Sequence, residues 1–232
     1  MIKGITETSF LDWDGKIVMV LYTGVCNYRC PFCHNWELME NPERFPDKSW
    51  EEIKAFLTEH VDFLDGVCIT GGEPTLEKEL EHWIVRIREL GLKVKLDTNG
   101  SVPGVLDDLI EKRLLDAVAM DVKAPPDERY SGACGTDVDL DAIVQSIRLV
   151  SESGVEHEFR TTVVPTIHQI EDITDIARAL SGAEKYVLQQ FNPANTWDEE
   201  LRKIVPYPND VLLDMANAAK EHVKEVRVRG LR

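Results

Sequence analysis

The sequence lacks the features that mark membrane and secreted proteins. Its longest apolar run falls far below the roughly 20 residues that span a bilayer. Its start, MIKGITETSFLDWDGK, has neither the positive beginning nor the continuous apolar stretch of a secretory signal. We therefore expect a cytoplasmic protein without a membrane partner.

Basic residues are also scarce. The chain has 26 Lys and Arg residues against 42 Asp and Glu residues, a net charge of −16. No run of Lys or Arg could follow a phosphate backbone. We expect no nucleic-acid partner.

Cysteine is sparse and unevenly placed. The five cysteines are an odd number, and three of them lie between positions 26 and 33. This suits a metal site in a reducing compartment better than a disulfide scaffold. The other two cysteines are isolated. Cys68 is expected to act as a small hydrophobic residue in a buried strand, and Cys134 to be a stray thiol in a loop.

Short β-rich apolar runs alternate with longer amphipathic segments. The predicted strands are Lys16–Tyr22, Gly66–Thr70, Leu92–Asp97, Asp116–Asp121, Glu156–Val164, Lys185–Phe191 and Glu225–Arg229. The predicted helices are Ser49–His60, Glu77–Leu90, Val105–Lys112, Leu140–Ser153, Ile170–Leu180 and Asn209–Lys224.

This alternation predicts a parallel sheet with right-handed crossovers. About six units are too few to close an eight-stranded barrel, so we expect an α/β fold, an open, partial (β/α)6 barrel of the TIM type. With no low-complexity segment or linker in view, residues 1–232 are expected to form a single domain. Residues 125–139 and 192–208 are predicted to be loops.

A cysteine loop follows the first predicted strand. Cys26, Cys30 and Cys33 have the spacing C-x3-C-x2-C, which can place three thiolates on three irons of a cubane. With no fourth cysteine nearby, one iron would be open to a small molecule. The alternative is a zinc site that adds His34, but adjacent Cys33 and His34 would have difficulty reaching one tetrahedral ion.

This loop resembles the signature of the radical S-adenosylmethionine (SAM) superfamily, including the aromatic Phe32 before the last cysteine. The string Cys33-His34-Asn35 is similar to the activases of glycyl radical enzymes. The resemblance implies a 4Fe-4S cluster held by Cys26, Cys30 and Cys33, a radical SAM fold, and a cofactor site that includes Phe32 and His34.

A turn of two glycines, Gly71-Gly72-Glu73-Pro74, follows the second predicted strand. Glycine there lets backbone groups approach a ligand. By resemblance this is the GGEP motif, in which Gly72 and Glu73 hold the amino group of SAM. The alternative is a plain strand-to-helix turn, with Pro74 starting a helix and Glu73 near its positive end.

The next two strands end in Asp97-Thr98-Asn99-Gly100 and in Asp121-Val122-Lys123, at the edge where parallel strands place their chemistry. They resemble motifs of pyruvate formate-lyase activating enzyme. The resemblance implies that Asp97, Thr98, Asp121 and Lys123 surround SAM, with a monovalent cation as a further candidate. The alternative for Asp121 and Lys123 is a structural ion pair.

Two further residues are candidates for the SAM site. Arg160 lies in the fifth predicted strand, and Asn192 follows the sixth, where the pyruvate formate-lyase activases carry a histidine. Asparagine keeps the hydrogen-bonding capacity of that position but does not titrate.

The resemblance implies reductive cleavage of SAM to a 5′-deoxyadenosyl radical. Without a second cysteine cluster or an appended domain, a minimal activase that installs a glycyl radical is expected. Residues 9–16 and 33–38 look most like activators of anaerobic ribonucleoside-triphosphate reductase. The alternatives are a pyruvate formate-lyase activating enzyme, a radical SAM enzyme that acts on a small metabolite, and a non-catalytic iron-sulfur or zinc protein. The expected partners are a glycyl radical enzyme and, as electron donor, reduced flavodoxin or ferredoxin.

Overall fold

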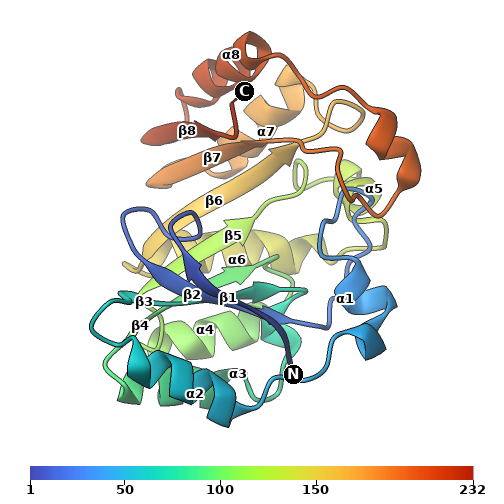
Figure 1. The fold of residues 1–232 in the computed structure, drawn as a ribbon. Coiled ribbons are helices and arrows are strands. Elements are labelled where there is room, and N and C mark those ends of the chain that lie inside the picture. Colours follow the sequence, from blue (N-terminus) through green and yellow to red (C-terminus); the bar gives the residue numbers. More distant parts are fainter. Residues whose placement is uncertain (232) are drawn as a thin grey trace. The chain divides into compact units, whose positions relative to one another are not determined.

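The computed structural model describes residues 1–231 (Figure 1). By their mutual contacts these residues group into two compact units. The first unit comprises Met1–Asn27, Asn35–Thr98 and Gly104–Val118. The second comprises Tyr28–His34, Asn99–Pro103 and the chain from Ala119 onward.

The sheet of the first unit is formed by β1 (Ile2–Ser9), β2 (Val18–Thr23), β3 (Gly66–Gly71) and β4 (Lys93–Thr98). Strands β2, β3 and β4 run parallel, and β1 pairs antiparallel with β2. The parallel strands are buried along most of their length. Near-continuous burial is typical of parallel strands covered on both faces.

Helices of the first unit are α1 (Glu37–Glu40), α2 (Trp50–Glu59), α3 (Leu80–Glu89) and α4 (Pro103–Glu111), with short 3-10 turns η1 (Pro42–Arg44) and η2 (Pro74–Leu76). Figure 1 shows α2 and α3 on one side of the strands. Helix α3 packs on β4 through the buried face Leu80, Ile84 and Ile87, because residues three and four apart share one face of a helix.

The start of α2 follows from its sequence. Ser49 Oγ accepts from the Glu52 amide at 3.2 Å, and Glu52 Oε2 accepts from the Ser49 amide at 2.9 Å. This capping box satisfies amides that have no partner within the helix. The predicted start of this helix at Ser49 is confirmed, with Ser49 as its N-cap.

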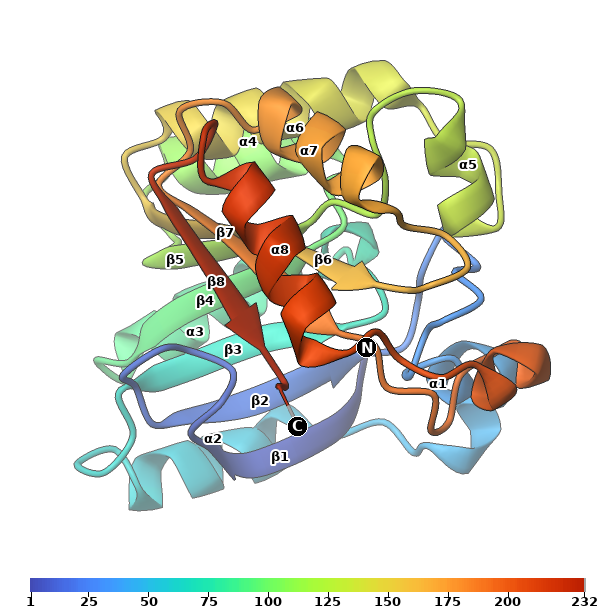
Figure 2. The ribbon, with the colours of Figure 1, turned by 90° about the horizontal axis from the view of Figure 1, so that it is seen from above.

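Strands β6 (Glu156–Val163), β7 (Lys185–Gln190) and β8 (Glu225–Arg229) of the second unit run parallel. Its helices are α5 (Arg129–Cys134), α6 (Leu140–Glu152), α7 (Ile170–Ala179) and α8 (Asn209–Ala219), with a 3-10 turn η3 (Glu199–Lys203). Helix α8 packs beside α7 and lies over β7 and β8 (Figures 1 and 2).

Strand β5 (Ala117–Asp121) begins in the first unit and ends in the second. In residues 1–231 the strands follow the order of the chain in one eight-stranded sheet, from β1 to β8. This open order, with helices between the strands, confirms the predicted α/β class with a partial barrel.

Three predictions about individual elements are wrong. Strand β1 was not predicted, since its segment, IKGITETS, has no clear alternation of apolar and polar residues. Helix α5 lies in a segment predicted to be a loop. The helix predicted to run to Lys224 ends at Ala219, and the His222 carbonyl instead accepts from the Gly182 amide at 3.1 Å.

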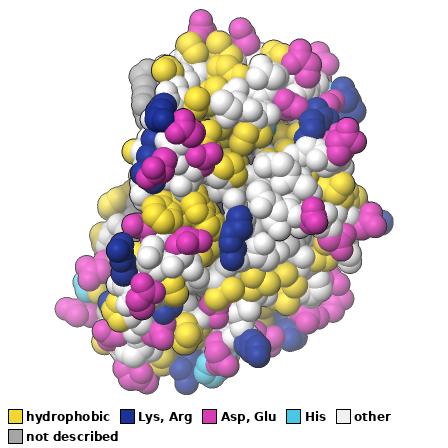
Figure 3. Space-filling view, turned by 90° about the vertical axis from the view of Figure 1, so that its right-hand side faces the viewer, with side chains coloured by type: hydrophobic (Ala, Val, Ile, Leu, Met, Phe, Trp, Pro, Cys, Tyr) yellow, Lys and Arg dark blue, Asp and Glu magenta, His cyan; other side chains and the backbone are white. Residues whose placement is uncertain are grey.

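The surface agrees with the acidic composition. On the face drawn in Figure 3, Asp and Glu side chains are scattered among hydrophobic and neutral atoms, and Lys and Arg side chains are interspersed with them. None of the helices in residues 1–231 is long and apolar enough to cross a membrane.

Candidate active site

The second unit holds the last two cysteines of the loop in one tight turn. The Cys33 amide donates to the Cys30 carbonyl at 3.0 Å. Cys30 is buried and Cys33 is half-buried. Phe32, between them, is also buried.

Cys134, the last residue of α5, lies against this turn. The Arg29 amide donates to the Cys134 carbonyl at 2.8 Å. Hydrogen bonding with the Cys134 side chain lowers the pKa of Cys30, burial opposes the effect, and the positive charge of Lys123 adds to it. The prediction that Cys134 is a stray thiol missed this contact.

Residues 192–198 lie along the same loop. The His34 ring, through Nε2, is hydrogen-bonded to the Asn192 carbonyl at 2.8 Å, and Asn195 Nδ2 donates to the His34 carbonyl at 3.3 Å. The Asp198 amide donates to the Pro31 carbonyl at 2.9 Å. This use of the His34 ring weighs against the zinc alternative.

The Asn192 side chain has a local partner. Its Oδ1 accepts from the Ala194 amide at 3.1 Å, and the residue is exposed. A bond of this kind stabilises a turn. A contact between Asn192 and a cofactor therefore stays a prediction.

Asp121, at the end of β5, lies between two cations. Arg160 Nε, from β6, donates to Oδ1 at 2.8 Å, and Lys123 Nζ donates to Oδ2 at 2.9 Å. Burial by itself would raise the pKa of Asp121, but the charges of Arg160 and Lys123 outweigh it and hold that pKa well below its usual range. The structure thus brings together three of the predicted site residues with both carboxylate oxygens engaged.

The His168 ring contacts the backbone of Lys123. It is fully buried, its Nδ1 accepts from the Val164 amide at 3.0 Å, and its Nε2 is 2.8 Å from the Lys123 carbonyl. Since Nδ1 accepts, Nε2 carries the proton and donates to Lys123. Burial lowers the pKa of His168, which favours the neutral ring that this pairing requires.

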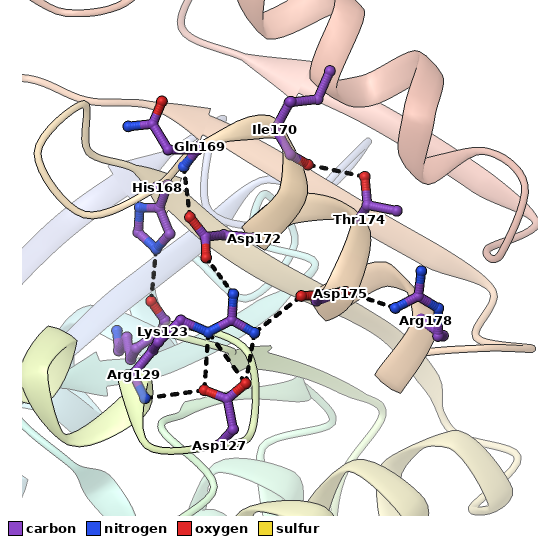
Figure 4. A network of polar contacts seen from close by, with 10 residues as sticks. All are labelled: Lys123, Asp127, Arg129, His168, Gln169, Ile170, Asp172, Thr174, Asp175 and Arg178. Carbon is purple, nitrogen blue, oxygen red and sulfur yellow. Dashed lines mark hydrogen bonds and ion pairs between the residues drawn. The ribbon is translucent and has the colours of Figure 1, made fainter.

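Arg129, the first residue of α5, joins that helix to α7 (Figure 4). Its Nη1 contacts Asp172 at 2.7 Å, and its Nη2 contacts Asp175 at 3.0 Å and Asp127 at 2.5 Å. Asp172 also caps the start of α7 by accepting from the Gln169 amide at 2.7 Å. Helix α5, which carries Cys134, is therefore fixed at its first turn.

In the first unit, the glycine turn after β3 is hydrogen-bonded to the start of the cysteine loop. The Gly72 amide donates to the Thr23 carbonyl at 2.9 Å, and the Glu73 amide donates to the Val25 carbonyl at 2.6 Å. A Cβ at Gly72 would lie 2.1 Å from the Val25 oxygen. Only glycine permits this approach, because real Cβ atoms do not come so close.

Glu73 is fully buried and joins the ends of β3 and β4. Its Oε1 accepts from the Thr75 amide at 3.1 Å, from Thr75 Oγ1 at 2.6 Å and from Thr98 Oγ1 at 2.6 Å. Three hydrogen bonds to one carboxylate oxygen thus fix the orientation of Glu73 in the turn.

Asp97 forms a buried ion pair with a residue that sequence analysis missed. Lys95 Nζ donates to Asp97 Oδ1 at 2.5 Å, and the two side chains are only 4% and 7% exposed. Both residues lie on β4 two positions apart, so their side chains share a face. The positive charge beside Asp97 therefore comes from the chain itself.

The other two cysteines also lie in the first unit. Cys26 is half-buried. Cys68 is fully buried in a cluster with Trp13, Val18, Val20 and Ala117, as expected for a small hydrophobe. Asn35 Nδ2 donates to the Gly71 carbonyl at 3.1 Å, which joins the end of the Cys-His-Asn string to the glycine turn.

The residues present fit an iron-sulfur cluster and SAM. Thiolate is the ligand of such clusters, the neighbours of Cys30 favour its thiolate, and the turn at Gly72 leaves no room for a side chain. Among residues 1–231 no group of three or more His, Cys, Asp or Glu side chains is already arranged to hold a metal ion. The ligand set of Cys26, Cys30 and Cys33 thus stays a prediction from spacing and donor chemistry.

Comparisons with known proteins agree on one family. Residues 20–180 match the model of the Radical SAM superfamily. A Methanocaldococcus jannaschii protein provisionally named a glycyl-radical enzyme activating enzyme is 36% identical, covering 100% of this chain and 96% of that protein. Pyruvate formate-lyase-activating enzyme of Clostridium pasteurianum is 25% identical, covering 82% of each chain.

The fold is also found among solved structures. The crystal structure of Streptococcus suis SuiB bound to precursor peptide SuiA matches with a TM-score of 0.70 and 16% identity, covering 91% of this chain and 48% of that chain. At this identity the match concerns the fold alone.

Proposed function

The chain belongs to the radical SAM superfamily of enzymes, and we propose that it activates a glycyl radical enzyme. The observation that carries this proposal is the match, at 36% identity over the whole chain, to a protein named for that activity. The superfamily uses a 4Fe-4S cluster and SAM, as the cysteine loop predicted. When bound, these cofactors supply reductive cleavage of SAM to a 5′-deoxyadenosyl radical that can take a hydrogen atom from a glycine.

In this proposal Cys26, Cys30 and Cys33 hold the cluster. The Cys134 side chain and the charge of Lys123 favour the Cys30 thiolate that iron requires, and they outweigh the opposing effect of burial. Phe32 is buried between Cys30 and Cys33, and His34 fixes the loop to the Asn192 backbone.

The residues at the strand ends would bind SAM. Gly72 lets the backbone of Val25 pack against the turn, and Glu73 is oriented by Thr75 and Thr98 to accept the amino group of SAM. Asp97 would contribute beside them. Asp121, Lys123 and Arg160 form a rigid charged group that would orient the ribose and methionyl parts. The monovalent cation stays a prediction, and Lys95 already places a positive charge on Asp97.

We further propose anaerobic ribonucleoside-triphosphate reductase as the partner that receives the radical. Reduced flavodoxin or ferredoxin would supply the electron, and the cytoplasm would be the compartment. A single functional domain over residues 1–232 is part of the same proposal. A radical SAM enzyme of a small metabolite is the alternative, since the charged group around Asp121 would bind SAM equally well in either case.

The test is electron paramagnetic resonance of the anaerobic enzyme incubated with SAM, a strong reductant and the partner. A glycyl doublet should form only when all components are present, and the Cys30→Ala variant should give none. Alanine in place of the target glycine of the partner should also remove the signal. Rapid turnover of a small molecule without any partner would contradict the proposal.

A further inference from the structure

A second thiol lies beside one of the proposed cluster ligands. Cys134 is fully buried, Cys30 is 7% exposed, and the Cys134 side chain is the main cause of the lowered pKa of Cys30. The remaining cysteine outside the loop, Cys68, belongs to the core of the first unit. Cys134 is thus placed to react with Cys30.

The backbone keeps the two thiols together. The Arg29 amide donates to the Cys134 carbonyl at 2.8 Å. This bond joins Cys134 to the residue that precedes Cys30. Gly135 adopts φ +64°, and a Cβ there would lie 2.3 Å from the Arg29 carbonyl oxygen. The two chain segments therefore pack backbone against backbone, with no side chain between them.

Helix α5 holds Cys134 from the other side. Arg129 fixes its first turn through Asp127, Asp172 and Asp175 (Figure 4). Tyr130, also on α5 and fully buried, accepts from the Lys123 amide through its hydroxyl at 3.2 Å. These contacts do not depend on a cluster, so the position of Cys134 survives the loss of one.

We propose that Cys30 and Cys134 form a reversible disulfide when an oxidant removes the cluster, and that this bond protects the ligand until the cluster is rebuilt. The inference rests on the proposed function in one respect, the assignment of Cys30 as a cluster ligand. It adds a role for Cys134, which the activation reaction does not use.

The chemistry balances with a peroxide as oxidant. Cys30 thiolate attacks hydrogen peroxide and becomes a sulfenic acid, with hydroxide released. The Cys134 thiol then condenses with it to give the disulfide and water. Without a neighbouring thiol, the sulfenic acid proceeds to the sulfinic and sulfonic acids, which are not reversed by thiols. A dithiol reductant restores both thiols by exchange.

The experiment begins with anaerobically reconstituted full-length protein. It is treated with hydrogen peroxide and a chelator, alkylated in denaturant, digested without reduction and mapped by mass spectrometry. We expect a peptide pair joined through Cys30 and Cys134. After reduction, the protein should reload iron to its starting content.

The variants separate this role from a structural one. In Cys134→Ser, which is nearly isosteric, Cys30 should be recovered as sulfinic or sulfonic acid, and iron reloading should fall several-fold. Cys134→Ala is the second variant if serine perturbs the fold. Cys68→Ala is the matched control, because it removes a buried thiol from the other unit, and it should behave like the native chain.

Three results would overturn the proposal. They are a disulfide between Cys30 and Cys33, a disulfide through Cys26, and equal overoxidation of Cys30 in the native chain and in Cys134→Ser. Failure to load about four irons per chain before oxidation would instead contradict the proposed function. Iron content tests the proposed function and the disulfide map tests the role of Cys134. The two are measured separately, so failure of one proposal can be told from failure of the other.

Discussion

Lys95 and Asp97 show how a single buried pair constrains the first unit. Their side chains are 4% and 7% exposed, and Nζ lies 2.5 Å from Oδ1. Removing one member of such a pair leaves a charge buried without compensation, which is far more costly than removing both. Asp97 is also a proposed SAM contact. Its carboxylate therefore has to stay charged, and the charge of Lys95 compensates it.

We predict that Lys95→Met lowers the free energy of unfolding by about 3 kcal/mol or more. The double variant Lys95→Met/Asp97→Asn should recover a large part of that loss, since no charge is then left buried. Urea unfolding of the anaerobic proteins measures both. Lys93→Met, at an exposed position of the same strand, is the control and should change little. If the double variant were as unstable as Lys95→Met, the loss of stability would not come from an uncompensated charge on Asp97.

Sequence reasoning located residues at strand ends but not their pairings. Asp121 and Lys123 were predicted together because a short motif carries both, and the structure joins them at 2.9 Å. Lys95 was not predicted, since Lys93 and Lys95 alternate with apolar residues as on a solvent-facing strand. Cys134 lies more than a hundred residues from Cys30, and no local pattern relates two such positions.

At the scale of elements, the short helix α5 depends on its contacts with α7. A helix of six residues is not stable by itself. Arg129 supplies the connection, because it contacts two carboxylates of α7, Asp172 and Asp175, in addition to Asp127 (Figure 4). Loss of the Arg129 side chain should therefore make local opening of α5 easier.

We predict that Arg129→Ala raises the rate of amide hydrogen exchange in α5 roughly five-fold, as expected for a loss of about 1 kcal/mol in a partly exposed ion-pair network. Arg178→Ala is the matched control, because Arg178 contacts Asp175 but none of the residues of α5. Exchange followed by mass spectrometry should show no change in α5 for the control. Equal exchange in both variants would mean that Arg129 does not anchor the helix.

The elements that were missed share a cause. The strands of the sheet were predicted because they are short apolar runs rich in β-forming residues, and the helices because their apolar residues follow a period of about 3.6 residues. Strand β1 is stabilised by its antiparallel pairing with β2, and α5 by ion pairs with a distant helix. Both depend on contacts across the fold, which a local pattern does not contain.

At the scale of the whole molecule, the carboxylates determine the response to acid. The pKa of Asp121 is lowered in the folded protein by Arg160 and Lys123, against the effect of burial. The unfolded chain therefore binds more protons in acid than the folded one. The stability from this group is fully present above the unfolded pKa, near 4, and is lost as the pH falls toward the lowered value.

We predict that the native chain is more stable than Asp121→Asn at pH 6 and that the difference narrows toward pH 3. Each additional proton bound by the unfolded chain changes the free energy of unfolding by about 1.4 kcal/mol per pH unit. Urea unfolding of both proteins across this range measures the difference, in which acid effects common to the two chains cancel. A difference in free energy of unfolding that stays constant with pH would show that the charge of Asp121 does not stabilise the fold.

The close approach of Gly72 to the Val25 oxygen, 2.1 Å from where a Cβ would be, bears on how such proteins can be recombined. The segments at 23–25 and 71–73 are complementary main-chain surfaces, and neither tolerates a shifted counterpart. Chimaeras between relatives should therefore be viable when both segments come from the same parent. A crossover between them would combine two backbones that were never fitted to each other, even though every cysteine and every acidic residue is retained.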